Sequence, residues 1–107
     1  MKVFTEPTIQ IYIYMAGDID TAKAACRQYC FDKGLCVTAT HTDFIYTGGH
    51  EFGIQVGLVN YPRFPTNEEN LTSTALELAN LLITKCCQWT ALVVTPTNTH
   101  WLSRRES

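Results

Sequence analysis

A strict alternation of apolar and polar residues near the start of the chain is the strongest constraint on its fold. Over residues 8–15, four apolar side chains would point to one face of an extended segment and two tyrosines to the other: Ile9, Ile11, Ile13 and Met15 against Tyr12 and Tyr14. A period of two with β-branched and aromatic residues is typical of a half-buried strand. This segment is therefore predicted to be a strand with one face in the core.

Helical spacing follows this strand. Asp18 or Asp20 can cap a helix that runs to about Lys33, and Gly34 suits the left-handed position after its end. Its predicted inner stripe is Ile19, Ala22, Ala25, Cys26 and Tyr29. A second helix is predicted from a capping box formed by Thr66 and Glu69 to about residue 87, with Leu71, Ala75, Leu78, Ala79 and Leu82 inward.

The remaining segments are predicted to be strands. They cover residues 35–47, with a bulge at 41–43, then 52–60 and 90–95, and residues 100–102 are a candidate fifth strand. Gly48 and Gly49 are expected to form a hairpin turn, with His50 exposed in it. Gly53 and Gly57 fall on one face of their strand, where they leave room for a helix, a partner chain or a ligand.

The element order β-α-β-β-α-β predicts an α+β fold, a ferredoxin-like sandwich with both helices on one face of an antiparallel sheet. Residues 1–107 are predicted to form a single domain, with an N-terminal extension at 1–7 and a polar tail at 103–107. The other sheet face, with its tyrosines and glycines, would be exposed in a monomer. We therefore expect the protein to self-associate through a second copy of the same chain.

Composition limits the partners and the compartment. Eight Lys and Arg against ten Asp and Glu give a net charge of −2, which argues against duplex nucleic acid as a partner. No apolar run approaches the ~20 residues of a membrane span, and the N-terminus has no apolar leader core. An odd number of cysteines, five, without a secretion signal predicts reduced thiols in the cytoplasm. The lack of C-x-x-C argues against a zinc ribbon or a thioredoxin-type motif.

Metal binding and catalysis find little support in the motifs. The cysteines are interpreted as small buried side chains, and a composite metal site with His41, His50 or His100 is the less favoured alternative. His41 and Asp43 could act as a base and its orienting carboxylate, but two polar groups in a bulged strand explain them as well. The sequence therefore predicts no metal, no cofactor, no catalytic residue and no enzymatic activity.

The segment from Asn60 to Pro65 is the best local signal for ligand binding. Arg63 is a planar cation between two prolines, Tyr61 and Phe64 offer flat surfaces, and the following helix start favours anions. A surface arginine in a proline turn is an equally good interpretation. The tail pairs Trp101 with Arg104, and Arg27 is a looser candidate for a second anion site. The predicted ligand-binding residues are Arg63, Phe64, Asn60, Tyr61, Trp101, Arg104 and Arg27.

Three segments, Gly34–Thr38, Tyr46–Gly49 and Gly57–Pro65, resemble the phage anti-Thoeris "sponge" proteins. The resemblance implies a phage or prophage protein of the bacterial cytoplasm. It would sequester a cyclic ADP-ribose-type immune signal, or a cyclic oligonucleotide of CBASS-type immunity, without cleaving it. It also implies a homodimer or a trimer of dimers. The alternative is a small ferredoxin-like interaction module for single-stranded RNA or a host protein. In the RNA-binding alternative, bases would stack on Tyr12, Tyr14 and Phe52. The net negative charge of the chain argues against this alternative.

Overall fold

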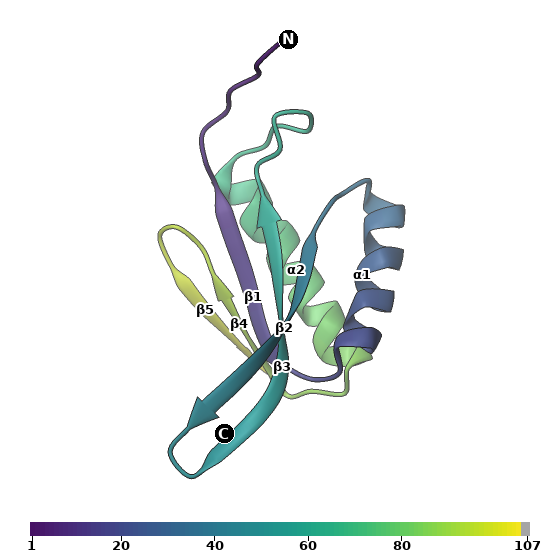
Figure 1. Ribbon diagram of the computed structural model, residues 1–107, viewed down its shortest axis with the longest axis vertical. Helices are drawn as coiled ribbons and strands as arrows, with labels where there is room; N and C mark the ends of the chain where they lie inside the picture. Colours follow the sequence, from purple (N-terminus) through teal and green to yellow (C-terminus); the bar gives the residue numbers. More distant parts are fainter. Residues whose placement is uncertain (106–107) are drawn as a thin grey trace.

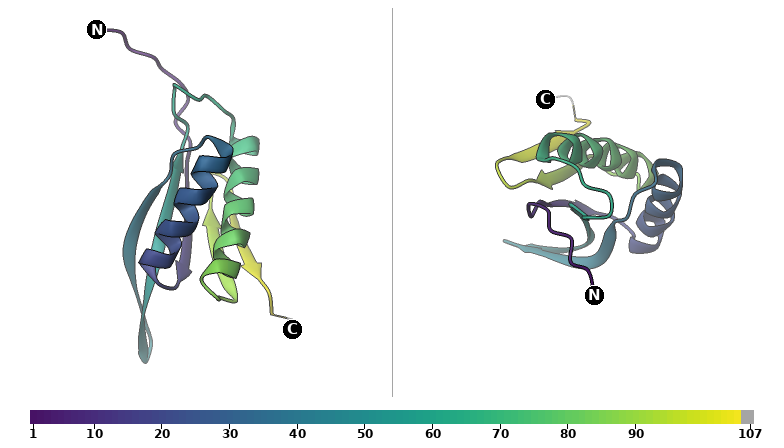
Figure 2. Two further views of the ribbon diagram at one scale, coloured as in Figure 1. Left: turned by 90° about the vertical axis from the view of Figure 1, so that its right-hand side faces the viewer. Right: turned by 90° about the horizontal axis from the view of Figure 1, so that it is seen from above.

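The computed structural model describes residues 1–105 as an antiparallel five-stranded sheet with two helices on one face (Figure 1; Figure 2). In chain order the elements are β1 (Gln10–Ala16), α1 (Ile19–Lys33), β2 (Thr38–Tyr46), β3 (Gly49–Val59), α2 (Glu68–Lys85), β4 (Thr90–Val94) and β5 (Thr99–Ser103). The sheet order is β2-β3-β1-β4-β5. The predicted α+β class is confirmed. The strand count exceeds the β-α-β-β-α-β pattern, because all of β5 pairs with β4 at the sheet edge. Residues 106 and 107 of the predicted tail lie outside the described residues.

The core lies between the sheet and the helices. Ile11 and Ile13 of β1 and Ile54, Val56 and Leu58 of β3 are fully buried, because alternate residues of both central strands face the helices. The predicted inner stripes of both helices meet them there; Ile19 is only half-buried, and Ile83 joins the stripe of α2. The period-two and helical patterns therefore identified the core correctly.

The helix ends show which capping predictions hold. Asp18 caps α1 by accepting a hydrogen bond from the Thr21 amide (2.9 Å), and Gly34 adopts the left-handed conformation after its end. The predicted capping box at Thr66 is wrong, because Asn67 is the cap of α2 and accepts from the Asn70 amide (2.8 Å). Within residues 1–105, neither helix is both long and apolar enough to cross a membrane.

The β2–β3 hairpin extends well beyond the helices (Figure 1). Its register is continuous from Thr38 opposite Gly57 to Tyr46 opposite Gly49, so the predicted bulge is absent. Within residues 42–52 no residue is buried, and Phe52, on the same face of β3 as the buried Ile54, is 64% exposed. We call residues 42–52 the hairpin arm. It leaves the core because the helices end before they reach it.

Candidate functional site

The sheet face away from the helices carries most of the aromatic side chains of the strands. The register places Tyr12 and Tyr14 of β1 on this open face, and the same pairing aligns Phe44 and Tyr46 of β2 and Trp101 of β5 with them. Glu51 of β3 pairs with Phe44 and is the one charged side chain that the described strands place on this face. The open face is therefore an aromatic surface with a single carboxylate.

The glycines of β3 allow these rings to lie flat on the sheet. A Cβ added to Gly53 would overlap the Phe44 ring, and one added to Gly49 would overlap the Tyr46 ring. A Cβ at Gly57 would lie 3.5 Å from the Tyr12 ring. The sequence predicted that Gly53 and Gly57 leave room for a helix, a partner or a ligand. The Phe44 ring occupies that room over Gly53, and the Thr38 hydroxyl and the Tyr12 ring occupy it over Gly57. The aromatic rings of this face form a platform.

A shallow hollow of about 260 Å³ lies at one end of this platform. Among the residues that line it are Tyr14, Phe44, Tyr46, Glu51 and Trp101. Trp101 is 65% exposed, so its indole is free to contact a ligand. Aromatic faces stack on nucleobases and attract cations, and a carboxylate next to them adds a fixed negative charge. The hollow is therefore suited to a ligand with a flat ring and a positive group.

A second cluster lies on the opposite side of the hairpin arm. Asp43 Oδ1 lies 3.0 Å from His41 Nε2 and 3.1 Å from His50 Nε2. The His41 and then the His50 hydrogen bond lower the pKa of the Asp43 carboxyl below its ordinary value. Both rings also pack against Phe52, at centroid distances of 5.4 and 5.1 Å. Asp43 thus serves as the shared acceptor of two histidines.

This cluster was only partly predictable. A pairing of His41 with Asp43 was one of two interpretations of their spacing, whereas His50 was expected to lie in the turn. In the structure the turn is Thr47-Gly48, and His50 lies in β3, diagonal to Asp43 on the same face. A turn at Gly48-Gly49, as predicted from the sequence, would place Asp43 opposite Ile54 and away from His50. Only the observed register, with Tyr46 opposite Gly49, brings His50 diagonal to Asp43. No three His, Cys, Asp or Glu side chains among residues 1–105 are arranged to hold a metal ion.

The predicted ligand residues around Asn60 lie in the loop after β3. The Arg63 guanidinium is 5.7 Å from the Phe64 ring centroid, and the Cys36 thiol donates to the Tyr61 hydroxyl (3.4 Å). Asn60 is buried, and its side chain joins two backbone segments. Its amide donates to the Pro7 carbonyl (2.9 Å) and its oxygen accepts from the Thr66 amide (2.8 Å). Both ends of Asn60 are therefore used inside the protein.

The other predicted residues are not close to this loop. Arg104 donates a hydrogen bond to Thr84 near the end of α2, whereas Arg63 precedes the start of that helix. An 18-residue helix spans about 27 Å, so one subunit does not bring these two arginines together. Trp101 lies on the open face, and Arg27 lies on α1 beside a pocket under β2. Of the predicted set, only Trp101 contributes to the platform.

The five cysteines have different environments. All are free, but only Cys26 is buried, and Cys36 and Cys87 are exposed. Burial raises the pKa of the Cys26 thiol to about 11, with smaller contributions from Cys30 and Cys86. The prediction of small buried side chains therefore holds for Cys26 alone.

Comparisons with known proteins identify the fold. No protein-family model matches the sequence, and no curated protein matches it. The structure is similar to a phage SAM lyase in its apo state, with a TM-score of 0.74 and 13% identity over 92% of this chain and 91% of that chain. It is also similar to a phage SAM lyase in complex with S-methyl-5′-thioadenosine, with a TM-score of 0.71 and 12% identity over 99% and 98% of the two chains. At this identity the likeness establishes the fold.

These neighbours contradict the functional predictions made from the sequence. The resemblance to anti-Thoeris sponges is wrong, and with it the sponge function, the cyclic nucleotide partner and the lack of enzymatic activity, since both neighbours are named as SAM lyases. The alternative prediction, a non-enzymatic interaction module for single-stranded RNA or a host protein, is contradicted by the same two neighbours. The resemblance rested on short turn and loop segments. In the segment Gly57–Pro65, the hydrogen bonds of Asn60 to the protein backbone give that residue a structural role.

Proposed function

We propose that this protein binds S-adenosylmethionine (SAM) on its open face and cleaves it as a lyase. The observation that carries the proposal is the likeness of the whole chain to a SAM lyase bound to S-methyl-5′-thioadenosine. The aromatic platform and Glu51 provide independent support from this chain itself. SAM has a flat adenine and two positive groups, a sulfonium and an ammonium, and these are the features that the hollow suits.

The chemistry of the platform fits a sulfonium substrate. Adenine would stack on an exposed ring such as Trp101, while the sulfonium would lie against the faces of Phe44 or Tyr46. Glu51 would bind the ammonium group of SAM and so orient its amino-acid arm. A cation desolvated on aromatic rings is stabilised by roughly 2 kcal/mol. Together, the stacked adenine, the sulfonium on the aromatic rings and the contact with Glu51 would position the substrate without a metal or a cofactor.

A lyase reaction at this site would break the bond between the sulfonium sulfur and the carbon of the amino-acid arm. The electron pair stays on sulfur, which becomes the neutral thioether of S-methyl-5′-thioadenosine. The arm leaves without taking up water. Either the carbon next to the broken bond gives its proton to solvent as a double bond forms, or the arm's own carboxylate oxygen forms a bond to the carbon that sulfur leaves. Positive charge on sulfur disappears in this step.

We further propose a ferredoxin-like core that self-associates. The order β2-β3-β1-β4 with both helices on one face supports the ferredoxin-like class. The hollow of about 260 Å³ is smaller than the ~300–1,000 Å³ typical of ligand sites. One subunit therefore provides a floor, and a second copy would cover the substrate. Five free thiols support a cytoplasmic location.

The test is product formation from SAM by purified protein. We expect S-methyl-5′-thioadenosine to accumulate in chromatography with mass detection, and the second product to carry no ¹⁸O when the reaction is run in labelled water. Glu51→Gln should lower kcat/KM by about tenfold or more, because it removes a charge-assisted contact. Glu69→Gln, which changes an exposed carboxylate on α2, is the matched control and should keep full activity.

Four results would each contradict a part of the proposal. Folded protein that forms no product and shows no thermal shift with SAM or S-methyl-5′-thioadenosine would refute the whole assignment. Binding without cleavage would refute the lyase activity. Equal activity in Glu51→Gln and wild type would refute the open face as the site. Light scattering that shows a monomer under turnover conditions would refute self-association.

A further inference from the structure

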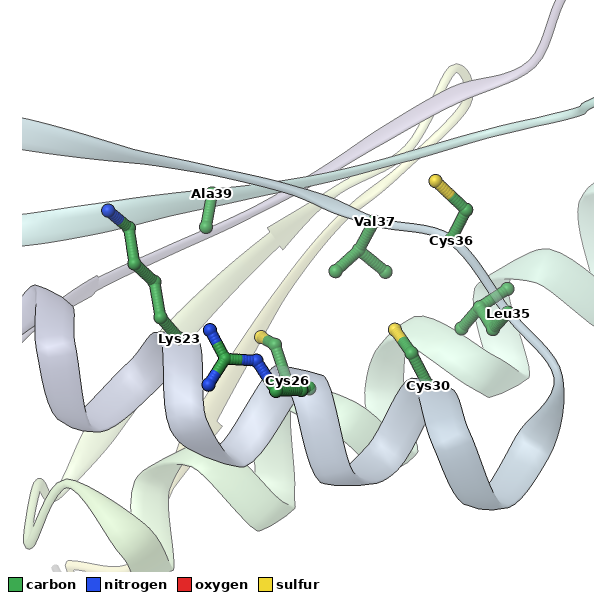
Figure 3. Close-up of a pocket in the computed structure, with 8 residues that line it drawn as sticks. Lys23, Cys26, Cys30, Leu35, Cys36, Val37 and Ala39 are labelled. Atoms are coloured by element: carbon green, nitrogen blue, oxygen red, sulfur yellow. The ribbon is translucent and has the colours of Figure 1, made fainter.

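A pocket of about 340 Å³ lies on the helix side of the sheet, between α1 and the start of β2 (Figure 3). It is separate from the open face, because Val37 and Ala39 point toward the helices. In Figure 3 the side chains of Cys26 and Cys30 point from α1 toward β2, and Val37 points back toward them. The pocket exists because the facing residues are small, so the strand and the helix do not close against each other.

The helix presents a mixed stripe to this pocket. Lys23, Cys26, Arg27 and Cys30 follow the spacing of one helix face, i, i+3, i+4 and i+7. The two cysteines form an apolar floor with Leu35 and Val37, and the two cations form one side of the rim. An apolar body with two positive groups at its edge is the complement of an organic anion.

The two cations have no ionic partner inside the described part of the chain. The ion pairs among residues 1–105 are those of Lys33 with Glu77 and of His41 and His50 with Asp43. Lys23 and Arg27 are one helical turn apart, and like charges at this spacing repel each other. An anion bound between them would relieve that repulsion. It would also neutralise two charges next to an apolar pocket.

We propose that this pocket is a second ligand site, specific for a small organic anion with a compact apolar body, such as a short-chain carboxylate. The pocket volume is near the lower limit of ligand pockets, so a carboxylate with a six-carbon chain fits the pocket better than a nucleotide does. Lys23 and Arg27 bind the carboxylate, and the thiols of Cys26 and Cys30 line the apolar part. The site does not depend on SAM binding or cleavage.

Protection of Cys30 from alkylation tests the proposal. The full chain is treated with neutral iodoacetamide in the presence of sodium hexanoate, 1-hexanol or inorganic phosphate, and each cysteine is followed by peptide mass mapping. Hexanoate should slow alkylation of Cys30 by about fivefold or more. The same concentrations of 1-hexanol, which lacks the charge, and of phosphate, which lacks the chain, should have little effect. Exposed Cys87 should react at the same rate throughout and is the internal control.

Variants of the rim complete the experiment. Lys23→Gln and Arg27→Gln should each raise the hexanoate concentration needed for half-maximal protection by about tenfold, while circular dichroism and the melting temperature stay unchanged. Lys85→Gln, at the end of α2, is the matched control for loss of one positive charge. Equal protection by hexanoate and hexanol, protection that survives both rim variants, or no protection at all would overturn the proposal. Equal slowing at Cys87 would overturn it as well.

Discussion

Gly53→Ala should be far more destabilising than Gly57→Ala, although both glycines lie on the same face of β3. A Cβ at Gly53 would overlap the Phe44 ring and would lie 2.5 Å from the Met15 carbonyl oxygen. That carbonyl belongs to the paired central strand and cannot move without disturbing the sheet. Overpacking of this kind costs about 1–3 kcal/mol, and we expect the upper end of that range.

Gly57 has the opposite surroundings. Its added Cβ would meet the Thr38 hydroxyl at 2.5 Å, but Thr38 is an exposed side chain that can rotate away. Alanine is also favoured over glycine within a strand by roughly 0.5–1 kcal/mol. The two effects offset each other, so Gly57→Ala should change the free energy of unfolding by less than about 1 kcal/mol.

Urea unfolding followed by circular dichroism measures both values. The midpoint should fall clearly for Gly53→Ala, with an unchanged slope, and should barely move for Gly57→Ala. Adding Phe44→Leu to Gly53→Ala should restore only part of the loss, because the contact with the Met15 carbonyl remains. Equal midpoints for the two single variants, or full recovery in the double variant, would refute the argument that backbone contact decides the cost.

Three further predictions concern polar groups. Asn60→Ala should lower the free energy of unfolding by about 1–3 kcal/mol, because two backbone groups lose their partner, and an unchanged urea midpoint would contradict this. Burial, together with a hydrogen bond to a carboxylate, raises the pKa of Tyr29 to about 12. The folded state holds this proton more tightly, so stability should be full below about pH 10 and decline toward pH 12. Tyr29→Phe should flatten that decline in pH-dependent melting curves, and a parallel decline in this variant would count against Tyr29 as its source. Asp43 should titrate below its ordinary value in NMR, and the pKa should rise in His41→Gln/His50→Gln; an unchanged pKa there would exclude the histidines as the cause.

Regular elements could be predicted because local patterns encode them. The alternation in β1 and the inner stripes of both helices identified the core, and Asp18 and Gly34 identified the ends of α1. The cap of α2 was missed by one residue, since Thr66 and Asn67 are both good caps and only the loop geometry selects between them. That geometry is set by the hydrogen bond from the Thr66 amide to Asn60, 6 residues earlier in the chain.

The candidate site could not be predicted in the same way. Its residues come from four strands, and their proximity depends on the register of β2, β3, β1 and β5. Sequence reasoning favoured the arginines, because a cation in a rigid turn is a visible local signal. Glu51 gives no such signal in the sequence. It becomes notable only when the register surrounds it with Phe44, Tyr46 and Trp101.

The hairpin arm has an energetic consequence for the platform. Phe44, Tyr46 and Glu51 all belong to residues 42–52, where no side chain reaches the core. Segments with few buried contacts open at a lower free energy than the whole domain, so amide exchange should be fast in the arm and slow in β1. A ligand that binds only when the arm is paired and ordered has an apparent affinity equal to its intrinsic affinity multiplied by the fraction of molecules in that state. Substitutions in the hairpin arm near its turn at Thr47-Gly48 can therefore change substrate affinity while the melting temperature of the domain stays constant.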